Sequence, residues 1–151
     1  MYKFTLLAFL LLLCVTPAAA KRPDYLSIPA IDFYLPVGFV AIEGSTWNVD
    51  SLDTGIAYLD GTSQLGQSGN IAITGHDYAA FQRLDQLALG DMLILTNGTL
   101  DSVYRVTEIK TVDKAQVWVV YPTETDKLTL ITCVGDQRLV IVGVRVWISI
   151  S

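Results

Sequence analysis

The hydrophobic and polar positions of this chain fall into two unlike parts. Residues 4–15 form an apolar run that only Thr5 interrupts, whereas the remainder carries short apolar segments separated by polar and glycine-containing turns. Most of these segments are rich in β-branched and aromatic residues, which favour strands. The predicted strands are Tyr25–Ile28, Ile31–Leu35, Phe39–Ile42, Asn70–Thr74, Asp91–Leu95, Asp101–Lys110, Val117–Tyr121, Leu128–Cys133 and Leu139–Ile150.

Little of the chain has the pattern of a helix. The segment Ala79–Leu87 places Phe81, Leu84 and Leu87 at helical spacing, which predicts one short helix. The polar, irregular segment Asn48–Tyr58 is compatible with a single helical turn. Many short strands joined by turns, with one or two short helices, predict an all-β fold that closes or nearly closes into a barrel.

The dipeptide Asn97-Gly98 lies between two of the predicted strands. Asn-Gly is typical of a two-residue hairpin turn in which both central residues have positive φ. With Thr99 it also matches a glycosylation acceptor pattern, but the turn explains these residues without any modification. We therefore expect a tight hairpin at this point.

The first twenty residues have the organisation of an export signal. Met1-Tyr2-Lys3 gives a positive start, the apolar run follows, and Pro17–Ala20 supplies small residues of the A-x-A type. The apolar run is shorter than the roughly 20 residues of a membrane span. Extended to Ala20, however, it becomes a marginal span followed by Lys21-Arg22. The chain is therefore predicted to be exported, with residues 1–20 either a signal peptide cleaved after Ala20 or an uncleaved anchor that associates the protein with the membrane.

The remaining chain, residues 21–151, is predicted to form one domain. It contains no internal repeat and no linker-like segment. Lys3 lies in the export segment, so nine of the ten basic residues face all fifteen acidic residues. An acidic chain without a basic cluster argues against nucleic acid as a partner.

Cysteine usage is more informative than charge. The chain has two cysteines, and Cys14 lies in the export segment, which leaves Cys133 unpaired. Structural cysteines of exported proteins usually come in pairs. An unpaired one is either buried and inert or kept for its chemistry, in which the thiolate is the nucleophile. Cys133 is therefore a candidate nucleophile.

His76, the sole histidine, and Arg138 occupy positions from which they can meet Cys133. His76 and Cys133 each stand at the end of a predicted strand, and Arg138 opens the strand after the Gly135-Asp136 turn. Because arginine stays charged, its useful role is to donate hydrogen bonds to a substrate carbonyl or an oxyanion. Taken singly, each residue has an ordinary structural explanation. The catalytic hypothesis depends on the three together.

At these residues the chain resembles the sortases, cell-surface transpeptidases of bacteria and some archaea. Thr129-Leu130-Ile131-Thr132-Cys133 matches their T-L-x-T-C signature, and Asn70–His76 resembles the strand that leads to their catalytic histidine. Phe81–Leu84 and Leu89–Asp91 resemble the helix and the "GD" that follow, and Arg138–Ile141 resembles the arginine-led strand. The resemblance covers essentially the whole chain after the export segment and is nearer the compact class D and E types than class A.

The resemblance implies a closed eight-stranded β-barrel and a set of catalytic roles. Cys133 attacks a backbone carbonyl within a C-terminal sorting motif similar to L-P-x-T-G and forms a thioester. His76 acts as the acid to the leaving amine and then as the base to the incoming one, and Arg138 holds the substrate and the oxyanion. The implied partners are surface proteins with a C-terminal sorting signal and an amine acceptor on a peptidoglycan precursor or a pilin.

Two further residues are weaker candidates for substrate binding. Thr132 is expected to line the groove beside Cys133. Asp77 is a candidate to orient His76, although adjacent side chains of an extended segment point apart. No cofactor is implied, and the segment Thr111–Asp126 lacks the clustered carboxylates of a calcium site.

The chain also departs from the family pattern. Only four residues separate Cys133 from Arg138, fewer than in many sortases, and Thr111–Asp126, where the recognition loop lies, is brief. These departures bear on substrate selectivity more than on chemistry. One alternative is a non-catalytic sortase-like barrel that serves as a surface assembly or binding module, although such a module has no need of all three residues. Another is an L,D-transpeptidase, which would carry glycine where Thr132 stands.

Overall fold

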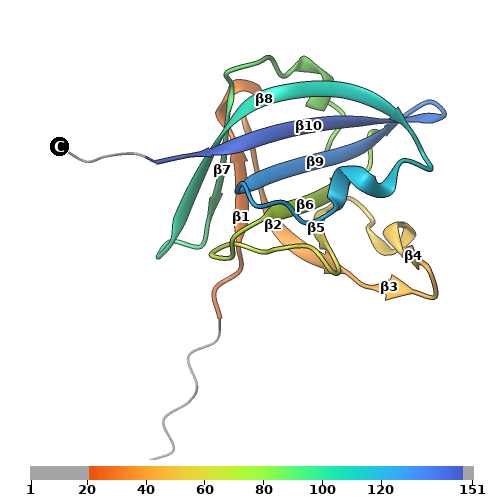
Figure 1. Cartoon of the computed structure of the whole chain (residues 1–151), viewed down its shortest axis with the longest axis horizontal. Helices are drawn as coiled ribbons and strands as arrows, with labels where there is room; N and C mark the ends of the chain where they lie inside the picture. The colour runs from red at the N-terminus through yellow and green to blue at the C-terminus, as the bar shows by residue number, and fades with distance from the viewer. Residues whose placement is uncertain (1–20, 148–151) are drawn as a thin grey trace, which may run out of the picture.

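In the computed structural model, which describes residues 21–147, eight strands close into a barrel (Figure 1). Their order around the barrel is β1-β2-β5-β6-β9-β10-β8-β7, and β7 pairs with β1 to close it. The strands are β1 (Tyr25–Ile28), β2 (Phe33–Val40), β5 (Ile56–Leu59), β6 (Asn70–Gly75), β7 (Met92–Thr96), β8 (Asp101–Asp113), β9 (Lys127–Val134) and β10 (Gln137–Val146). The predicted all-β closed barrel is confirmed.

Short elements complete the fold. A small hairpin, β3 (Ile42–Glu43) and β4 (Thr46–Trp47), stands outside the barrel. The helices of residues 21–147 are all short 3₁₀ helices: η1 (Pro29–Ile31), η2 (Val49–Ser51), η3 (Leu84–Gln86) and η4 (Val117–Val120). Within these residues, no helix has the length and apolar character needed to cross a bilayer. Residues 1–20, on which the export prediction rests, lie outside the described part of the chain.

The barrel interior is filled by alternate residues of the strands, because successive side chains of a strand point to opposite faces. On β9, Leu128 and Leu130 are fully buried in the main core, whereas Ile131 packs in a separate cluster on the outer face. β6 follows the same rule, with Ile71 and Ile73 inside and Ala72 outside. The odd-numbered residues of β9 therefore face away from the interior, and Cys133 is one of them.

Two strand pairs of the barrel are parallel, and one of them positions the site. β6 runs parallel to β9, with Ile73 opposite Leu130 and Thr74 opposite Ile131. Parallel strands end at the same edge of a sheet. Continuing this register by two residues brings His76 and Cys133 level with each other at that edge, although they lie far apart in sequence.

A buried polar pair fastens the first strand region to the barrel. The Tyr58 hydroxyl donates a hydrogen bond of 2.9 Å to the Asp24 carboxylate, and both residues are buried. Burial, together with this hydrogen bond and the charge of Asp24, raises the pKa of Tyr58 well above its usual range. Burial also raises the pKa of Tyr104, which is 1% exposed in the core.

Several sequence predictions need correction. The helix predicted over residues 79–87 is a series of turns that ends in η3, although Phe81, Leu84 and Leu87 are buried as its pattern required. The backbone amides of Ala79 and Phe81 both donate to the carbonyl of His76, so the chain turns tightly before a helix can propagate.

The strand predicted over Val117–Tyr121 is wrong as well. Val117–Val120 form η4, Tyr121 follows it, and the segment pairs with no strand of the described residues, because Val119 and Val120 pack against the outer face of the barrel instead. Local β-propensity has been overridden by tertiary packing here.

The Asn97-Gly98 turn exists in a different form. The loop joining β7 to β8 has four residues, and Gly98 alone has positive φ (78°). The Asn97 side chain accepts hydrogen bonds from the amides of Thr99 and Leu100, which stabilises the loop without a positive φ at Asn97.

The strand predicted over Tyr25–Ile28 is confirmed with the same ends, and the remaining predicted strands are present with shifted ends. β2 begins at Phe33, because Pro29–Ile31 form η1 and Asp32 adopts a left-handed conformation with φ of 50°. The predicted segment Phe39–Ile42 is divided between β2 and β3. β10 ends at Val146, so Trp147 lies outside the strand, and the last predicted residues, 148–150, lie outside the described part of the chain.

Candidate active site

Cys133 and Arg138 lie directly opposite each other on the antiparallel pair β9 and β10. The strands are joined by the two residues Gly135-Asp136, with Gly135 at a φ of 56°, as the first position of a type II′ turn requires. The short connection seen in the sequence therefore keeps both strands paired up to Cys133 and Arg138. As a result, the Arg138 Nη1 atom lies 2.9 Å from the Cys133 Sγ atom and donates a hydrogen bond to it.

His76 extends from the end of β6 onto the same outer face. Its imidazole stacks on the ring of Tyr78, with 4.8 Å between the ring centroids and 16° between the planes. Gly75, immediately before it, is buried against β5. A Cβ atom at Gly75 would lie 2.9 Å from Ile56 Cγ2 and 3.0 Å from Phe81 Cδ2, so this close packing requires glycine.

Thr132 does not line the groove, contrary to the sequence prediction. It is 3% exposed, and its hydroxyl donates a 2.8 Å hydrogen bond to the carbonyl of Gly75. The cause is strand alternation: when Cys133 points outward, Thr132 must point inward. Its hydrogen bond joins the strand end that carries Cys133 to the strand end that carries His76.

Asp77 is also outside the groove. Its carboxylate accepts a 3.0 Å hydrogen bond from the amide of Tyr78, which holds the turn after His76. The side chain is not among those that line the pocket. The structure therefore gives Asp77 a local role in the turn, where its side chain makes no hydrogen bond to the His76 imidazole.

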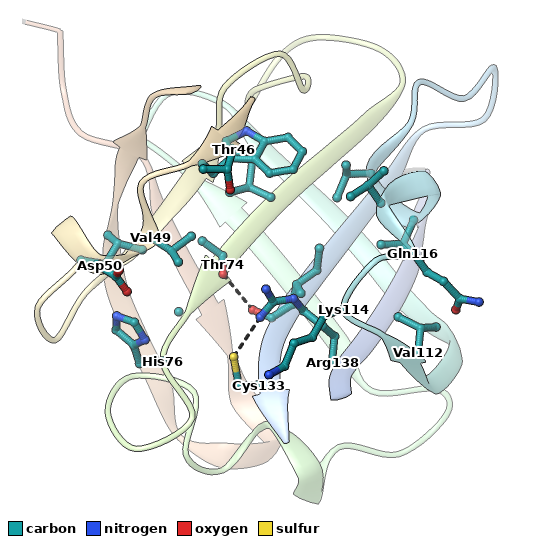
Figure 2. Close-up of a pocket in the computed structure, with 18 of the residues that line it drawn as sticks. Thr46, Val49, Asp50, Thr74, His76, Val112, Lys114, Gln116, Cys133 and Arg138 are labelled. Atoms are coloured by element: carbon teal, nitrogen blue, oxygen red, sulfur yellow. Dashed lines mark hydrogen bonds between the residues drawn. The ribbon is translucent and has the colours of Figure 1, made fainter. Parts of the chain in front are cut away.

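Cys133, Arg138 and His76 all line one pocket of about 490 Å³ (Figure 2). Its floor is the outer face of the barrel, and one wall is η4 with the segment before it. The lining is mixed, and its apolar members are Trp47, Val49, Leu52, Leu59, Val112, Val117, Val119, Val120 and Ile131. A pocket of this kind suits an extended peptide. A few polar groups of the lining can hold the peptide backbone, and the apolar lining residues can bury the peptide's apolar side chains.

The η4 wall is fastened to the barrel by Asn70, a residue that the sequence analysis did not single out. The Asn70 side-chain amide donates to the carbonyls of Val119 and Tyr121 at 3.0 and 3.1 Å. Its oxygen accepts a 2.7 Å hydrogen bond from the hydroxyl of Thr129. Asn70 is 3% exposed; its bond with Thr129 is buried, and its two bonds to the wall are partly buried. An asparagine at the start of a buried strand was the available signal.

Sequence reasoning also missed charged residues of the pocket. Asp50 of η2 and Lys114, which follows β8, both line it. The Lys114 ammonium lies 3.4 Å from the carboxylate of Asp136, and both side chains are well exposed. Across residues 21–147, no three side chains of the types that bind metals lie together in a possible metal site.

Comparison with known proteins gives a family that fits the geometry of the site. The sortase domain family model matches residues 26–146. Sortase D of Bacillus subtilis (strain 168) is 29% identical over 138 residues, covering 86% of this chain and 67% of that protein. Sortase A of Listeria monocytogenes is 29% identical over 112 residues, covering 72% of this chain and 47% of that protein. This chain thus matches about half the length of that sortase A.

Comparison with solved structures gives the same family as the sequence relatives. A mutant of sortase E from Streptomyces avermitilis superimposes with a TM-score of 0.68 at 26% identity, covering 84% of this chain and 89% of that structure. The chain belongs to the sortase family, whose members are cysteine transpeptidases. The three relatives carry class names D, A and E, so the resemblance to classes D and E stays a prediction.

Proposed function

We propose that Cys133, His76 and Arg138 are the catalytic residues of this sortase. The observation that carries the proposal is the contact of 2.9 Å between the Arg138 guanidinium and the Cys133 sulfur, in a pocket that His76 also lines. A hydrogen bond from a charged donor is strongest when its acceptor carries negative charge. The guanidinium is therefore placed to donate to the sulfur of the thiolate, which is the nucleophilic form of cysteine.

The proposed substrate is a surface protein with a C-terminal sorting motif similar to L-P-x-T-G. In the first half-reaction the Cys133 thiolate attacks the scissile carbonyl carbon, and a C–S bond forms. The C–N bond of the peptide then breaks, and the His76 imidazolium gives its proton to the leaving amine. Arg138 is placed to donate to the carbonyl oxygen while that oxygen carries negative charge.

In the second half-reaction an amine attacks the thioester. The C–N bond of the new amide forms, the C–S bond breaks, and neutral His76 takes a proton from the incoming amine. The acceptor is proposed to be an amine of a peptidoglycan precursor or a pilin. Since sortases act at the cell surface, export through residues 1–20 is proposed as the route by which the enzyme reaches both substrates.

The pocket supports a peptide substrate of this type. Apolar side chains of η4 and of the barrel face form a wall that can bury a residue such as leucine, and each such side chain contributes roughly 1.5–3 kcal/mol when fully buried. The charged groups stand at the reacting end of the pocket, around Cys133 (Figure 2). An apolar wall leading to a polar reacting end matches a motif that has its apolar residues before the scissile bond.

The test is to trap the thioester. The residue 21–151 protein is incubated with a fluorogenic library of sorting-motif peptides, and the acyl-enzyme is detected by intact-protein mass spectrometry. We expect a mass increase equal to the acyl fragment that is released by hydroxylamine and absent in Cys133→Ala. His76→Ala and Arg138→Lys are expected to lower the acylation rate by at least about 100-fold.

Arg145→Lys is the matched control for the arginine. Arg145 also lies on β10, but its guanidinium packs over the Trp147 ring at 4.4 Å and faces Asp126 at 3.7 Å. Its substitution should leave acylation within about twofold of the unsubstituted rate, because Arg145 does not line the pocket and lysine keeps a positive charge facing Asp126. Equal effects of the two arginine substitutions would contradict the role given to Arg138.

A thiol probe separates the enzyme from a non-catalytic binding module. Iodoacetamide should label Cys133 faster than it labels a free model thiol, and His76→Ala should change that rate. Slow labelling that is indifferent to His76, together with no thioester from any peptide, would refute the proposed function.

A further inference from the structure

The charges of the pocket are divided between its two sides. Figure 2 shows Arg138 and Lys114 on one side and His76 with Asp50 on the other. Among the described residues that line the pocket, Asp50 is the sole carboxylate. Two cations therefore face one anion across the space in which the acyl group is transferred.

The placement of Asp50 near the His76 end follows from strand pairing. η2, which contains Asp50, lies a few residues before β5, and β5 pairs with β6 so that Ile56 stands opposite Gly75. The chain thus enters β5 beside the residue that precedes His76. Asp50 is exposed, so its carboxylate is open to a ligand that enters the pocket from solvent.

We propose that Asp50 selects the acceptor substrate by binding its ammonium group and holding it next to His76. The inference rests on the proposed function and names the chemical class of its second substrate: a primary amine that is protonated in solution. The two sides of the pocket then have different tasks. The cationic side receives the carbonyl oxygen of the acyl group, and the anionic side receives the nucleophile.

The proton balance is consistent with this role. An ammonium acceptor loses one proton to neutral His76 and becomes the nucleophilic amine. The amine attacks the thioester carbon, the C–N bond forms, the C–S bond breaks, and the nitrogen gives its second proton to solvent. The products are the amide, the Cys133 thiolate and the His76 imidazolium, which are the forms that begin the next cycle.

This sequence predicts which kinetic constant depends on Asp50. The positive charge beside Asp50 is the ammonium before proton transfer and the imidazolium after it. Because the carboxylate faces one positive charge in both states, it favours binding of the acceptor more than the transfer step. Its substitution should therefore raise the KM for the acceptor with a smaller change in kcat.

The experiment compares a cationic and a neutral nucleophile at pH 6.5. Glycinamide is mostly an ammonium there, since α-amino groups have a pKa of about 7.7–8.0. Hydroxylamine is mostly neutral. In Asp50→Asn we expect the KM for glycinamide to rise about fivefold, as for the loss of an exposed ion pair. The KM for hydroxylamine should change by less than about twofold, and added salt should reduce the difference between variant and parent.

Asp53→Asn is the matched control. Asp53 is an exposed aspartate only three residues away, but it does not line the pocket. Its substitution removes the same net charge and should leave both KM values near those of the parent. If Asp53→Asn raises the KM for glycinamide as much as Asp50→Asn does, the effect comes from overall charge, and the inference is overturned.

Other outcomes are equally decisive. If Asp50→Asn lowers the thioester formation rate and the hydroxylamine rate by the same factor as the glycinamide rate, Asp50 positions His76 and does not select the acceptor. If the unsubstituted enzyme forms a thioester and Asp50→Asn keeps the KM for glycinamide, the inference fails while the proposed function stands. If the unsubstituted enzyme forms no thioester, the proposed function fails and the inference with it.

Discussion

Replacing Asn70 with alanine is expected to destabilise the barrel and to weaken peptide binding together. The side chain connects the barrel to the η4 wall through the carbonyls of Val119 and Tyr121, and it accepts a hydrogen bond from Thr129. Alanine removes all three bonds and leaves the Thr129 hydroxyl, which is 1% exposed, without this partner. The wall that these bonds hold carries several apolar side chains of the pocket.

The size of the effect follows from the number of bonds. An intramolecular hydrogen bond contributes about 1 kcal/mol net, so the loss of three should lower the free energy of unfolding by about 3 kcal/mol. With a urea slope of about 2 kcal/mol per molar for a domain of this size, the unfolding midpoint should fall by about 1.5 M. A surface substitution changes stability by less than about 0.5 kcal/mol.

Urea unfolding followed by intrinsic fluorescence measures this shift, and peptide acylation measures the effect on the site. Thr111→Val is a suitable control, because Thr111 is an exposed residue of β8. In Asn70→Ala the KM for the sorting peptide should rise, while iodoacetamide labelling of Cys133 should stay near the parent rate. A midpoint shift no larger than that of Thr111→Val, or an unchanged KM, would refute the role given to Asn70.

Three further predictions follow from the contacts around the site and the core. Gly75→Ala should cost about 1–3 kcal/mol of stability and slow acylation, because the added Cβ meets Ile56 at 2.9 Å; parent-like stability and rate would contradict this. Thr132→Val keeps the shape but removes the bond to the Gly75 carbonyl, so urea unfolding should show a loss of about 1–3 kcal/mol, and a neutral result would exclude that bond as a stabilising one. Tyr58→Phe should lower stability by about 1–3 kcal/mol at pH 8, because Asp24 loses its buried partner. Since the folded-state pKa of Tyr58 is raised, its contribution is present below about pH 10 and is lost as the pH rises further, so the parent should lose more stability than Tyr58→Phe between pH 9 and 11; parallel curves would contradict it.

The sequence predicted much of the barrel because strand patterns are local. Alternation of apolar and polar residues, and β-branched runs such as that ending at Cys133, place strands without knowledge of their partners. The same reasoning failed at Val117–Tyr121. The composition of this segment favours a strand, but among the described residues it has no neighbouring strand with which to pair. It also failed over residues 79–87, where buried positions at helical spacing are reached by turns. At both segments, tertiary packing determined which of several local conformations with similar free energy the chain adopts.

The candidate nucleophile and its partners were readable from the sequence because they are rare and lie at strand ends. One cysteine outside residues 1–20, one histidine and the T-L-x-T-C signature sufficed to name Cys133, His76 and Arg138. The same pattern misplaced Thr132, although alternation alone shows that it and Cys133 face opposite sides of β9.

Only the tertiary structure decided how these residues meet. The parallel register of β6 and β9 brings His76 level with Cys133, and the antiparallel register of β9 and β10 sets Arg138 against the sulfur. It also decided that Asn70 holds the pocket wall and that Asp50 lines the pocket. Strand pairing joins segments that are distant in the chain, and which strands pair depends on the closure of the whole barrel. The sequence by itself therefore determined which groups are available for chemistry, and the fold determined which of them face one another.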